Sequence, residues 1–213
     1  MKSYIVIGLG RFGAEMAVKL YDCGEEVLAV DMDETLIDKI ADRVTRAVAA
    51  DVRDIDVLKK LGAEVFDVAV VAVGSDLAAS ALITMNLKSL GLPCIICKAH
   101  DDTHREILER LGADKVIIPE RDMADKLSLG LTSAGVMEYI ELSEEYGIVE
   151  MQPPKAWVGK SIRQLELRSK FGLNVIAMRS GDDLGILPDI DVPIDDQHTL
   201  VMRGNYSVIN QLK

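Results

Sequence analysis

The sequence predicts an α/β protein in which a doubly wound parallel sheet is followed by a second, smaller α+β domain. Short apolar runs alternate with helical segments over residues 1–119, and the runs are continuous, as in parallel strands covered on both faces. A G-x-G-x-x-G motif joins the first run to the first helix. The alternation stops after residue 119, which indicates a different module beyond it.

Strands and helices of the first part follow from this alternation. The strands are expected at Ser3–Ile7, Glu26–Val30, Arg46–Ala49, Val68–Val73, Cys94–Lys98 and Lys115–Ile118. The helices between them are expected at Ala14–Tyr21, Glu34–Ala41, Ile55–Leu61, Leu77–Leu90 and Thr103–Leu111. In such a Rossmann-like unit, ligands bind beyond the carboxyl ends of the strands.

The glycine motif predicts a dinucleotide-binding turn, because it follows a strand and opens a helix. Gly8 allows the tight reversal, Gly10 lets the backbone approach a pyrophosphate, and Gly13 lets the helix pack closely on the strand. Arg11 and Phe12 lie within the same turn. The phosphates are expected at the helix N-terminus, where free N–H groups carry partial positive charge.

Asp31 ends the second strand at the distance from the glycines at which an acidic residue accepts hydrogen bonds from ribose hydroxyls. A carboxylate there repels a 2′-phosphate, which favours adenosine nucleotides or NAD over NADP. The alternative for Asp31 is a solvated turn residue. Asp33 is expected to cap the next helix.

Further candidates follow the third and fourth strands. Asp51 is expected beside the adenosine, at the end of Ala49-Ala50-Asp51-Val52. Gly74 permits close approach of a ligand, and Ser75 or Asp76 caps the following helix, with Asp76 preferred.

The fifth and sixth strand ends supply Lys98 and Glu120. Lys98 either meets a phosphate or is solvated. Glu120, just behind Pro119, either favours the dipole of the next helix or contacts a ligand. His100 and His104 show no metal-binding pattern.

Composition excludes several classes of function. A net charge of −11 over 213 residues argues against broad binding to nucleic acid or to an anionic membrane surface. The N-terminus reads as a structural strand without the features of a signal peptide, and no apolar run can span a bilayer, so a cytoplasmic protein is expected.

Cys94 and Cys97 are three apart on a strand, so they point to opposite faces and are expected to pack in the core.

The domains are predicted at 1–119 for nucleotide binding, 120–135 for a crossover helix centred on Asp122–Ala134, and 136–213 for a compact α+β module. The last module is expected to contain strands at Val136–Leu142, Ile148–Met151, Asn174–Arg179 and Thr199–Arg203. A helix from Gly159 to about Lys170 and an acidic loop, Asp182–Asp196, complete it.

The chain resembles the cytosolic regulatory subunits of Ktr/Trk-type potassium uptake systems, which join an RCK N domain to an RCK C (TrkA-C) domain. The resemblance rests on several segments that together span the chain: Ile7-Gly8-Leu9-Gly10-Arg11-Phe12-Gly13, Val30-Asp31, Ala50-Asp51, Ile118-Pro119-Glu120, Val158–Leu165 and Gly172–Ala177.

The resemblance implies an octameric ring assembled from dimers, bound to the cytoplasmic face of a membrane subunit that carries potassium. ATP and ADP, or NAD and NADH in the Trk branch, bind at the glycine turn. Arg11 then contacts the γ-phosphate of a nucleotide held by the neighbouring subunit, and Glu120 contacts a cation (Mg, Ca or Na) near the phosphates. Gating without chemistry is the expected activity, so no catalytic residue is assigned.

The C-terminal domain of related proteins binds cyclic di-AMP, which by position implies Ile162, Arg168 and Asn174. On sequence grounds, Arg168 and Asn174 also suit helix-end solvation and a loop cap.

For the function of the whole chain, an NAD-dependent oxidoreductase is the main alternative, but the three histidines of the chain lie in no recognisable catalytic setting. A redox-sensing DNA-binding protein is disfavoured by the acidic balance.

Overall fold

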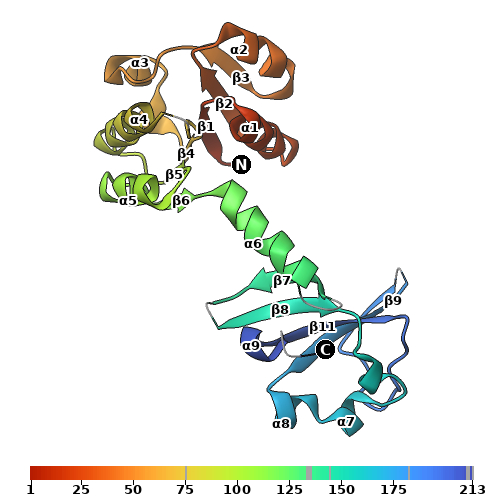
Figure 1. The fold of residues 1–213 in the computed structure, drawn as a ribbon. Helices are drawn as coiled ribbons and strands as arrows, with labels where there is room; N and C mark the ends of the chain where they lie inside the picture. Colours follow the sequence, from red (N-terminus) through yellow and green to blue (C-terminus); the bar gives the residue numbers. More distant parts are fainter. Residues whose placement is uncertain (75, 133–135, 144, 182, 210–211, 213) are drawn as a thin grey trace. The chain divides into compact units, whose positions relative to one another are not determined.

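The computed structural model describes residues 1–213 except 75, 133–135, 144, 182, 210–211 and 213. The chain divides into two compact units, Met1–Glu120 and Arg121–Lys213 (Figure 1). Each unit has its own sheet and its own core.

The first unit is built on a parallel sheet with the order β3-β2-β1-β4-β5-β6 over the described residues. Its strands are β1 (Ser3–Ile7), β2 (Glu26–Asp31), β3 (Arg46–Ala49), β4 (Val68–Val71), β5 (Ile95–Lys98) and β6 (Lys115–Ile117). Its helices are α1 (Arg11–Asp22), α2 (Glu34–Ile40), α3 (Ile55–Lys60), α4 (Leu77–Ser89) and α5 (Asp102–Arg110). The doubly wound prediction is confirmed, and the winding reverses between β1 and β4.

Alternate side chains of these strands feed two cores on opposite faces of the sheet. Ile5 and Ile7 pack with Leu58, Leu87 and Leu108 from α3, α4 and α5. On the other face, Val6, Val27 and Ala29 pack with residues of α1 and α2, such as Ala17 and Ile40. Figure 1 shows the two groups of helices on the two sides of the sheet.

Two boundaries at the centre of the sheet differ from the sequence prediction. Helix α1 begins at Arg11 rather than Ala14, so its first turn lies inside the glycine motif with Gly10 as N-cap. Strand β4 ends at Val71 rather than Val73. The Ala72 N–H still bonds the Ile7 carbonyl at 2.7 Å, and beyond it the chain leaves the sheet. The first shift shortens the loop after β1, and the second lengthens the loop after β4.

The cysteine prediction is confirmed. Cys97 is fully buried in the core beside α4, where Thr84 Oγ1 lies 3.3 Å from its Sγ. Cys94 packs against the opposite core. Burial raises the pKa of the Cys97 thiol to about 11, which keeps it protonated and inert at neutral pH.

The second unit is an antiparallel sheet with short helices. The sheet has the order β10-β9-β11-β8-β7 over the described residues. Its strands are β7 (Val136–Glu141), β8 (Tyr146–Met151), β9 (Asn174–Ser180), β10 (Asp183–Ile186) and β11 (His198–Asn205). Helices α7 (Ile162–Leu165), α8 (Leu167–Phe171) and α9 (Tyr206–Ile209) accompany it, and Trp157 lies in its core.

Two expectations for this unit are corrected, and one helix is added. The single helix from Gly159 to Lys170 is two short helices, because Glu166 between them adopts a left-handed conformation with φ of 49°. The supposed acidic loop contains β10, which pairs with β9 as a hairpin. Helix α9, at the C-terminal end of β11, was not predicted.

The connecting helix α6 spans Pro119–Thr132 and therefore begins before the predicted Asp122. Pro119 favours this earlier start, since its missing N–H and fixed φ suit the first helical turn. The predicted end at Ala134 lies outside the described residues. Across the described part of the chain, none of the helices combines the length and apolar character needed to cross a membrane.

Candidate functional site

The three glycines of the turn face different surroundings. A Cβ on Gly13 would lie 1.8 Å from the Gly8 carbonyl oxygen, so this position admits glycine alone. Gly8 has φ of 91°, and a Cβ there would lie 2.9 Å from Cγ2 of Val73. A Cβ on Gly10 would meet none of the described atoms within 4 Å. Two glycines are therefore required by packing, whereas Gly10 faces open space.

The N-terminus of α1 also differs from those of the helices that follow. Asp33, Asp54, Asp76 and Asp101 are the N-caps of α2, α3, α4 and α5, and each carboxylate accepts a backbone N–H. The Asp33 and Asp76 caps confirm the sequence prediction; the alternative cap, Ser75, lies outside the described residues. At α1 the cap is Gly10, and no described side chain bonds the first-turn N–H groups. These donors remain open to an anionic ligand.

Asp31 braces the glycine turn from the end of β2. Its Oδ2 accepts the Leu9 N–H at 2.6 Å, and its Oδ1 accepts the Asp33 N–H at 3.0 Å. The carboxylate is half-buried and has lone pairs left for further donors. The structure thus places Asp31 beside the turn and gives it a local structural role as well.

A first pocket of about 250 Å³, here called the inner pocket, opens at the carboxyl ends of β1, β2, β3 and β4. It brings together four predicted site residues, Gly8, Gly10, Asp31 and Asp51, and a fifth, Gly74. Its wall also contains residues that the sequence reading did not select, notably Met32, Arg53, Val73 and Ile83.

Arg53 and Asp51 form a two-point ion pair in the inner pocket. Arg53 Nε donates to Asp51 Oδ1 at 2.8 Å, and Nη2 donates to Oδ2 at 2.6 Å. The guanidinium holds the pKa of Asp51 below its ordinary value, and Asp51 raises the pKa of Arg53. Both groups stay charged at neutral pH, and Asp31 and Asp76 add negative charge to the same pocket.

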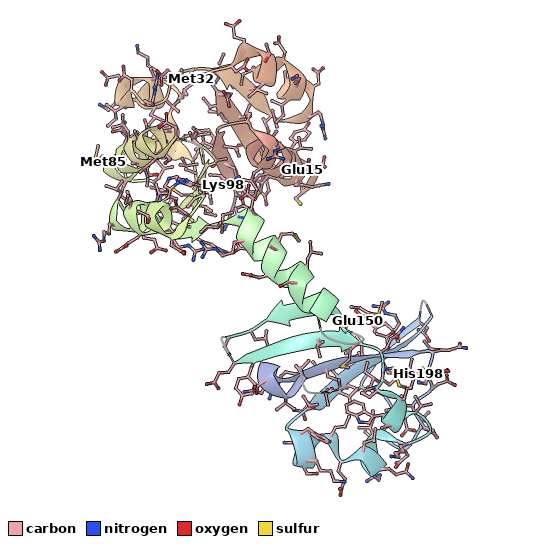
Figure 2. The ribbon with its side chains drawn as sticks, in the orientation of Figure 1. Glu15, Met32, Met85, Lys98, Glu150 and His198 are labelled. Carbon is pink, nitrogen blue, oxygen red and sulfur yellow. The ribbon has the colours of Figure 1, made fainter. Side chains whose placement is uncertain are left out.

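A second cavity, here called the outer pocket, is lined by Arg11, Phe12, Glu15, Lys98, His100 and Glu120. It shares Gly10, Ala72 and Gly74 with the inner pocket, so the two cavities meet at the N-terminus of α1. Figure 2 labels Met32 at the inner pocket and Lys98 at the outer one, at well-separated points of the first unit.

Lys98 and Glu120 bind each other across the outer pocket. Lys98 Nζ lies 2.6 Å from Glu120 Oε1 and 5.8 Å from the centre of the Phe12 ring. A Cβ on Gly74 would lie 3.3 Å from the Lys98 side chain, so Gly74 leaves room for the lysine stem. The hydrogen bond from Lys98 and the nearby charge of Arg11 hold the pKa of Glu120 below its ordinary value.

His100 and His104 belong to a hydrogen-bonded chain beside the outer pocket. Their Nδ1 atoms are 2.8 Å apart, His104 Nε2 lies 2.7 Å from Ser80 Oγ, and His100 Nε2 lies 3.1 Å from Asp101 Oδ2. Burial, followed by the neighbouring His100, lowers the pKa of His104. No cluster of three or more His, Cys, Asp or Glu side chains suited to a metal occurs among the described residues.

The second unit has a pocket of its own. It is lined by Ile162, Arg168 and Asn174, the three residues implied for cyclic di-AMP, together with Arg163, Leu173 and Ile190. Arg163 is tied to Asp191 through Nε at 2.6 Å and Nη2 at 3.1 Å. The structure therefore brings these three predicted residues together.

Met32 and Arg53 are two of the inner-pocket residues that the sequence reading missed. Met32 directly follows Asp31, and Arg53 lies two residues beyond Asp51. Reading each strand end two residues further would have found both, because the loops beyond parallel strands form the ligand-facing rim.

Comparison with known proteins supports one family along the chain. Residues 4–119 match the TrkA-N domain model, and residues 147–213 match the TrkA-C domain model. Two Bacillus subtilis proteins, Ktr system potassium uptake proteins C and A, are 37% and 38% identical over 212 residues. Each alignment covers 100% of this chain and 96% of the relative.

A solved structure has the same fold. The crystal structure of the GsuK RCK domain matches 98% of this chain with a TM-score of 0.67 at 20% identity. This chain covers 46% of that longer one. At that identity the match supports the fold alone. The two domain models and the Bacillus relatives carry the assignment: the chain belongs to the RCK-domain regulatory proteins of Ktr/Trk-type potassium uptake systems.

Proposed function

We propose that this chain senses an adenine nucleotide and gates a membrane potassium-translocating partner through a ligand-dependent change of shape, without chemistry. The observation that carries the proposal is the meeting of two pockets at the uncapped N-terminus of α1. A nucleotide has a neutral half and an anionic half. The inner pocket combines apolar side chains with an excess of carboxylates, whereas the outer pocket contains Lys98 beside the open N–H groups of α1.

The inner pocket suits the base and the ribose. Its described lining combines apolar side chains with the carboxylates of Asp31, Asp51 and Asp76. Carboxylates accept hydrogen bonds from hydroxyl groups but repel phosphates. Asp31 is the residue proposed for the ribose hydroxyls.

The phosphates then pass over Gly10 into the outer pocket. Open first-turn N–H groups of α1 and the side chain of Lys98 supply positive charge there. A phosphate near Lys98 competes with Glu120 for its ammonium group. Glu120, once released, is the proposed ligand for Mg, Ca or Na beside the phosphates.

Arg11 is proposed to contact the γ-phosphate of a nucleotide bound by a neighbouring copy of the chain. This contact lets ATP and ADP favour different shapes of the assembly. A ligand shifts such an equilibrium only by its difference in affinity for the two shapes, and the state of the channel feeds back equally on ligand affinity. NAD and NADH are the alternative ligands proposed for the same two pockets. Among fold relatives, one GsuK channel structure has NAD bound, and another GsuK structure has ADP bound.

The assembly proposed for the chain is an octameric ring of dimers held against the cytoplasmic face of the membrane by its partner. The names of the Bacillus relatives place them in potassium uptake systems. The negative net charge of the chain argues against a direct role for anionic lipid in this attachment.

Cyclic di-AMP is a second proposed ligand, for the pocket of the second unit. The supporting observation is that Ile162, Arg168 and Asn174, which are separated in sequence, line one cavity. Arg168 offers charge-assisted hydrogen bonds to a phosphodiester, and Ile162 offers an apolar contact to a base.

The test is a calorimetric titration of the full chain with ATP, ADP, NAD and NADH, with and without Mg, alongside its mass in solution. The proposal expects ATP and ADP to bind an octamer without hydrolysis. The Arg11→Ala variant should bind ADP with unchanged affinity. It should no longer show a difference between its affinities for ATP and ADP. Arg110→Ala, an exposed arginine on α5 paired with Glu106, is the matched control.

Three outcomes would count against the proposal. Turnover of NADH with carbonyl substrates by a small oligomer would favour an oxidoreductase. Salt-dependent DNA binding would favour a transcriptional regulator. Unchanged discrimination between ATP and ADP in Arg11→Ala would remove the arginine from the mechanism.

A further inference from the structure

We infer that Arg53 is the side chain that holds the purine base in the inner pocket, and that Asp51 is a positioning residue that acts through Arg53. The inference rests on the proposed nucleotide function and assigns the base-binding contact within that site. It also changes the role expected for Asp51, which the sequence placed directly beside the adenosine.

Arg53 is fixed at both its side chain and its backbone. Asp51 grips the guanidinium at two nitrogens, and its Oδ1 also accepts the Arg53 N–H at 3.1 Å. On the other side, Asn86 Nδ2 donates to the Arg53 carbonyl at 2.9 Å, and Asn86 is itself 8% exposed. The next residue, Asp54, caps α3. An arginine held this way is pre-organised before any ligand arrives.

The geometry leaves the faces of the guanidinium available. Asp51 occupies one edge of the planar group, through Nε and Nη2, so its two faces and remaining N–H donors are free of that pair. Val73 and Ile83 supply apolar wall elsewhere in the same pocket. A flat aromatic base gains a stacking and cation–π contact with guanidinium, and apolar contact with such a wall.

Charge argues that this arginine is not a phosphate ligand. The charged side chains lining the described inner pocket are Asp31, Asp51, Asp76 and Arg53, so negative charge exceeds positive. A phosphate entering there would face three carboxylates. The base carries no charge and avoids this repulsion. In the outer pocket Arg11 and Lys98 balance Glu15 and Glu120 beside the open N–H groups of α1, so a phosphate meets less repulsion there.

Asp51 accepts three hydrogen bonds from Arg53, two of them at Oδ1, so it has less acceptor capacity left for a ligand than Asp31, which accepts two. Its most direct effect on a ligand is therefore to set the plane of the guanidinium. This arrangement predicts that removing the Asp51 carboxylate weakens base binding less than removing the Arg53 side chain. In a variant that already lacks the Arg53 side chain, removing the Asp51 carboxylate should cause no further loss of base binding.

The experiment measures dissociation constants of adenosine, ADP and ATP for the full chain and four variants, by competition with a fluorescent ADP analogue. The variants are Arg53→Ala, Arg53→Lys, Asp51→Asn and the double variant Arg53→Ala/Asp51→Asn. Arg43→Ala, an exposed arginine outside both pockets, is the control. Thermal melts of each variant establish that it is folded.

Arg53→Ala is expected to weaken all three ligands equally, by roughly five- to thirty-fold, because all three share the base. Arg53→Lys should lose nearly as much, since a compact ammonium neither stacks nor forms the two-point pair. Asp51→Asn should lose about two- to five-fold, and the double variant should match Arg53→Ala.

A loss confined to ATP and ADP, or no loss in a folded Arg53→Ala, would overturn the inference. Additive losses in the double variant would overturn the positioning role of Asp51. These results are distinguishable from failure of the proposed function, which would appear as absence of ADP and ATP binding by the unaltered protein.

Discussion

Gly10 and Gly13 lie three residues apart in one turn, yet their substitution has different physical consequences. An alanine at Gly13 would force its Cβ into the Gly8 carbonyl, which is backbone and cannot move aside. An alanine at Gly10 would enter open space at an ordinary extended conformation with φ of −61°. One glycine therefore serves the fold, and the other is available to serve the ligand.

We expect Gly13→Ala to lower the free energy of unfolding of the first unit by more than about 3 kcal/mol, because the backbone must shift. Gly10→Ala should lower it by less than about 1 kcal/mol, the cost of a poorer N-cap. It should nevertheless weaken ADP binding by more than about tenfold, since the methyl group occupies the path of the pyrophosphate. Urea unfolding followed by far-UV circular dichroism, with ADP titration, measures both effects. Equal stability of the two variants would contradict this assignment.

The buried His104 makes the first unit sensitive to acid. Its pKa is lowered in the folded protein, mainly by burial, so the unfolded chain binds a proton more readily than the folded one. The stabilisation is present above the ordinary pKa of 6.5 and is lost as pH falls through the lower pKa of the folded state. His100 shares the hydrogen bond, and Asp101 partly opposes the shift.

We expect thermal stability of the first unit to fall from about pH 7 to about pH 5, and to fall less in His104→Gln, which cannot titrate there. Far-UV melts over this range provide the measurement. His198→Gln, a histidine of the second unit, should leave the slope unchanged. An identical slope in His104→Gln and the unaltered protein would show that other groups dominate.

Among the helices, the break between α7 and α8 stores backbone strain. Glu166 has φ of 49°, which is unfavourable for a residue with a Cβ. Its carboxylate pairs with Lys170 at 2.7 Å, but both side chains are more than half exposed, so the pair contributes little. The strain is maintained because Leu165 and Leu167, on either side, are both buried in the core of the second unit.

Glu166→Gly is therefore expected to stabilise the second unit by up to about 1 kcal/mol, because glycine adopts this conformation without strain. Trp157 is the single tryptophan of the chain and lies in this core, so its fluorescence reports unfolding of the second unit specifically. Lys170→Ala removes the ion pair while keeping the backbone and should change stability by less than about 0.5 kcal/mol. Destabilisation by Glu166→Gly would show that the carboxylate matters more than the strain.

At the scale of the whole molecule, the chain holds separate cores in its two units. The core residues of Met1–Glu120 come from its own strands and helices, and both pockets proposed for the nucleotide are lined by residues of that unit. The pocket proposed for cyclic di-AMP is lined by residues of the second unit.

A fragment of residues 1–120 is expected to fold and to bind ADP with an affinity within about threefold of the full chain, since all proposed contacts to ADP lie inside it. Circular dichroism and calorimetry test this directly. The same fragment carrying Arg53→Ala should show the weakening seen in the full chain. An unfolded fragment, or one that does not bind ADP, would show that the second unit is required for the site.

Sequence alone determined the features that depend on near neighbours in the chain. The glycine turn, the helix caps at Asp33 and Asp76 and the apolar parallel strands are set by local backbone conformation and by periodic burial, so a short window reveals them. The Asp51–Arg53 pair is equally local, because the two residues are only two positions apart in the chain. It was within reach of the sequence but was missed.

Tertiary structure decided what joins distant segments. Only the sheet order sets β1 beside β4 and so makes Gly10, Ala72 and Gly74 the meeting point of two pockets. Likewise, Lys98 meets Glu120 across 22 residues, and His104 meets Ser80 across 24. Such contacts depend on which elements pack together, and hydrophobic burial specifies the faces of those elements without specifying their partners. The sequence therefore fixes which groups the site contains, and the packing fixes which of them meet.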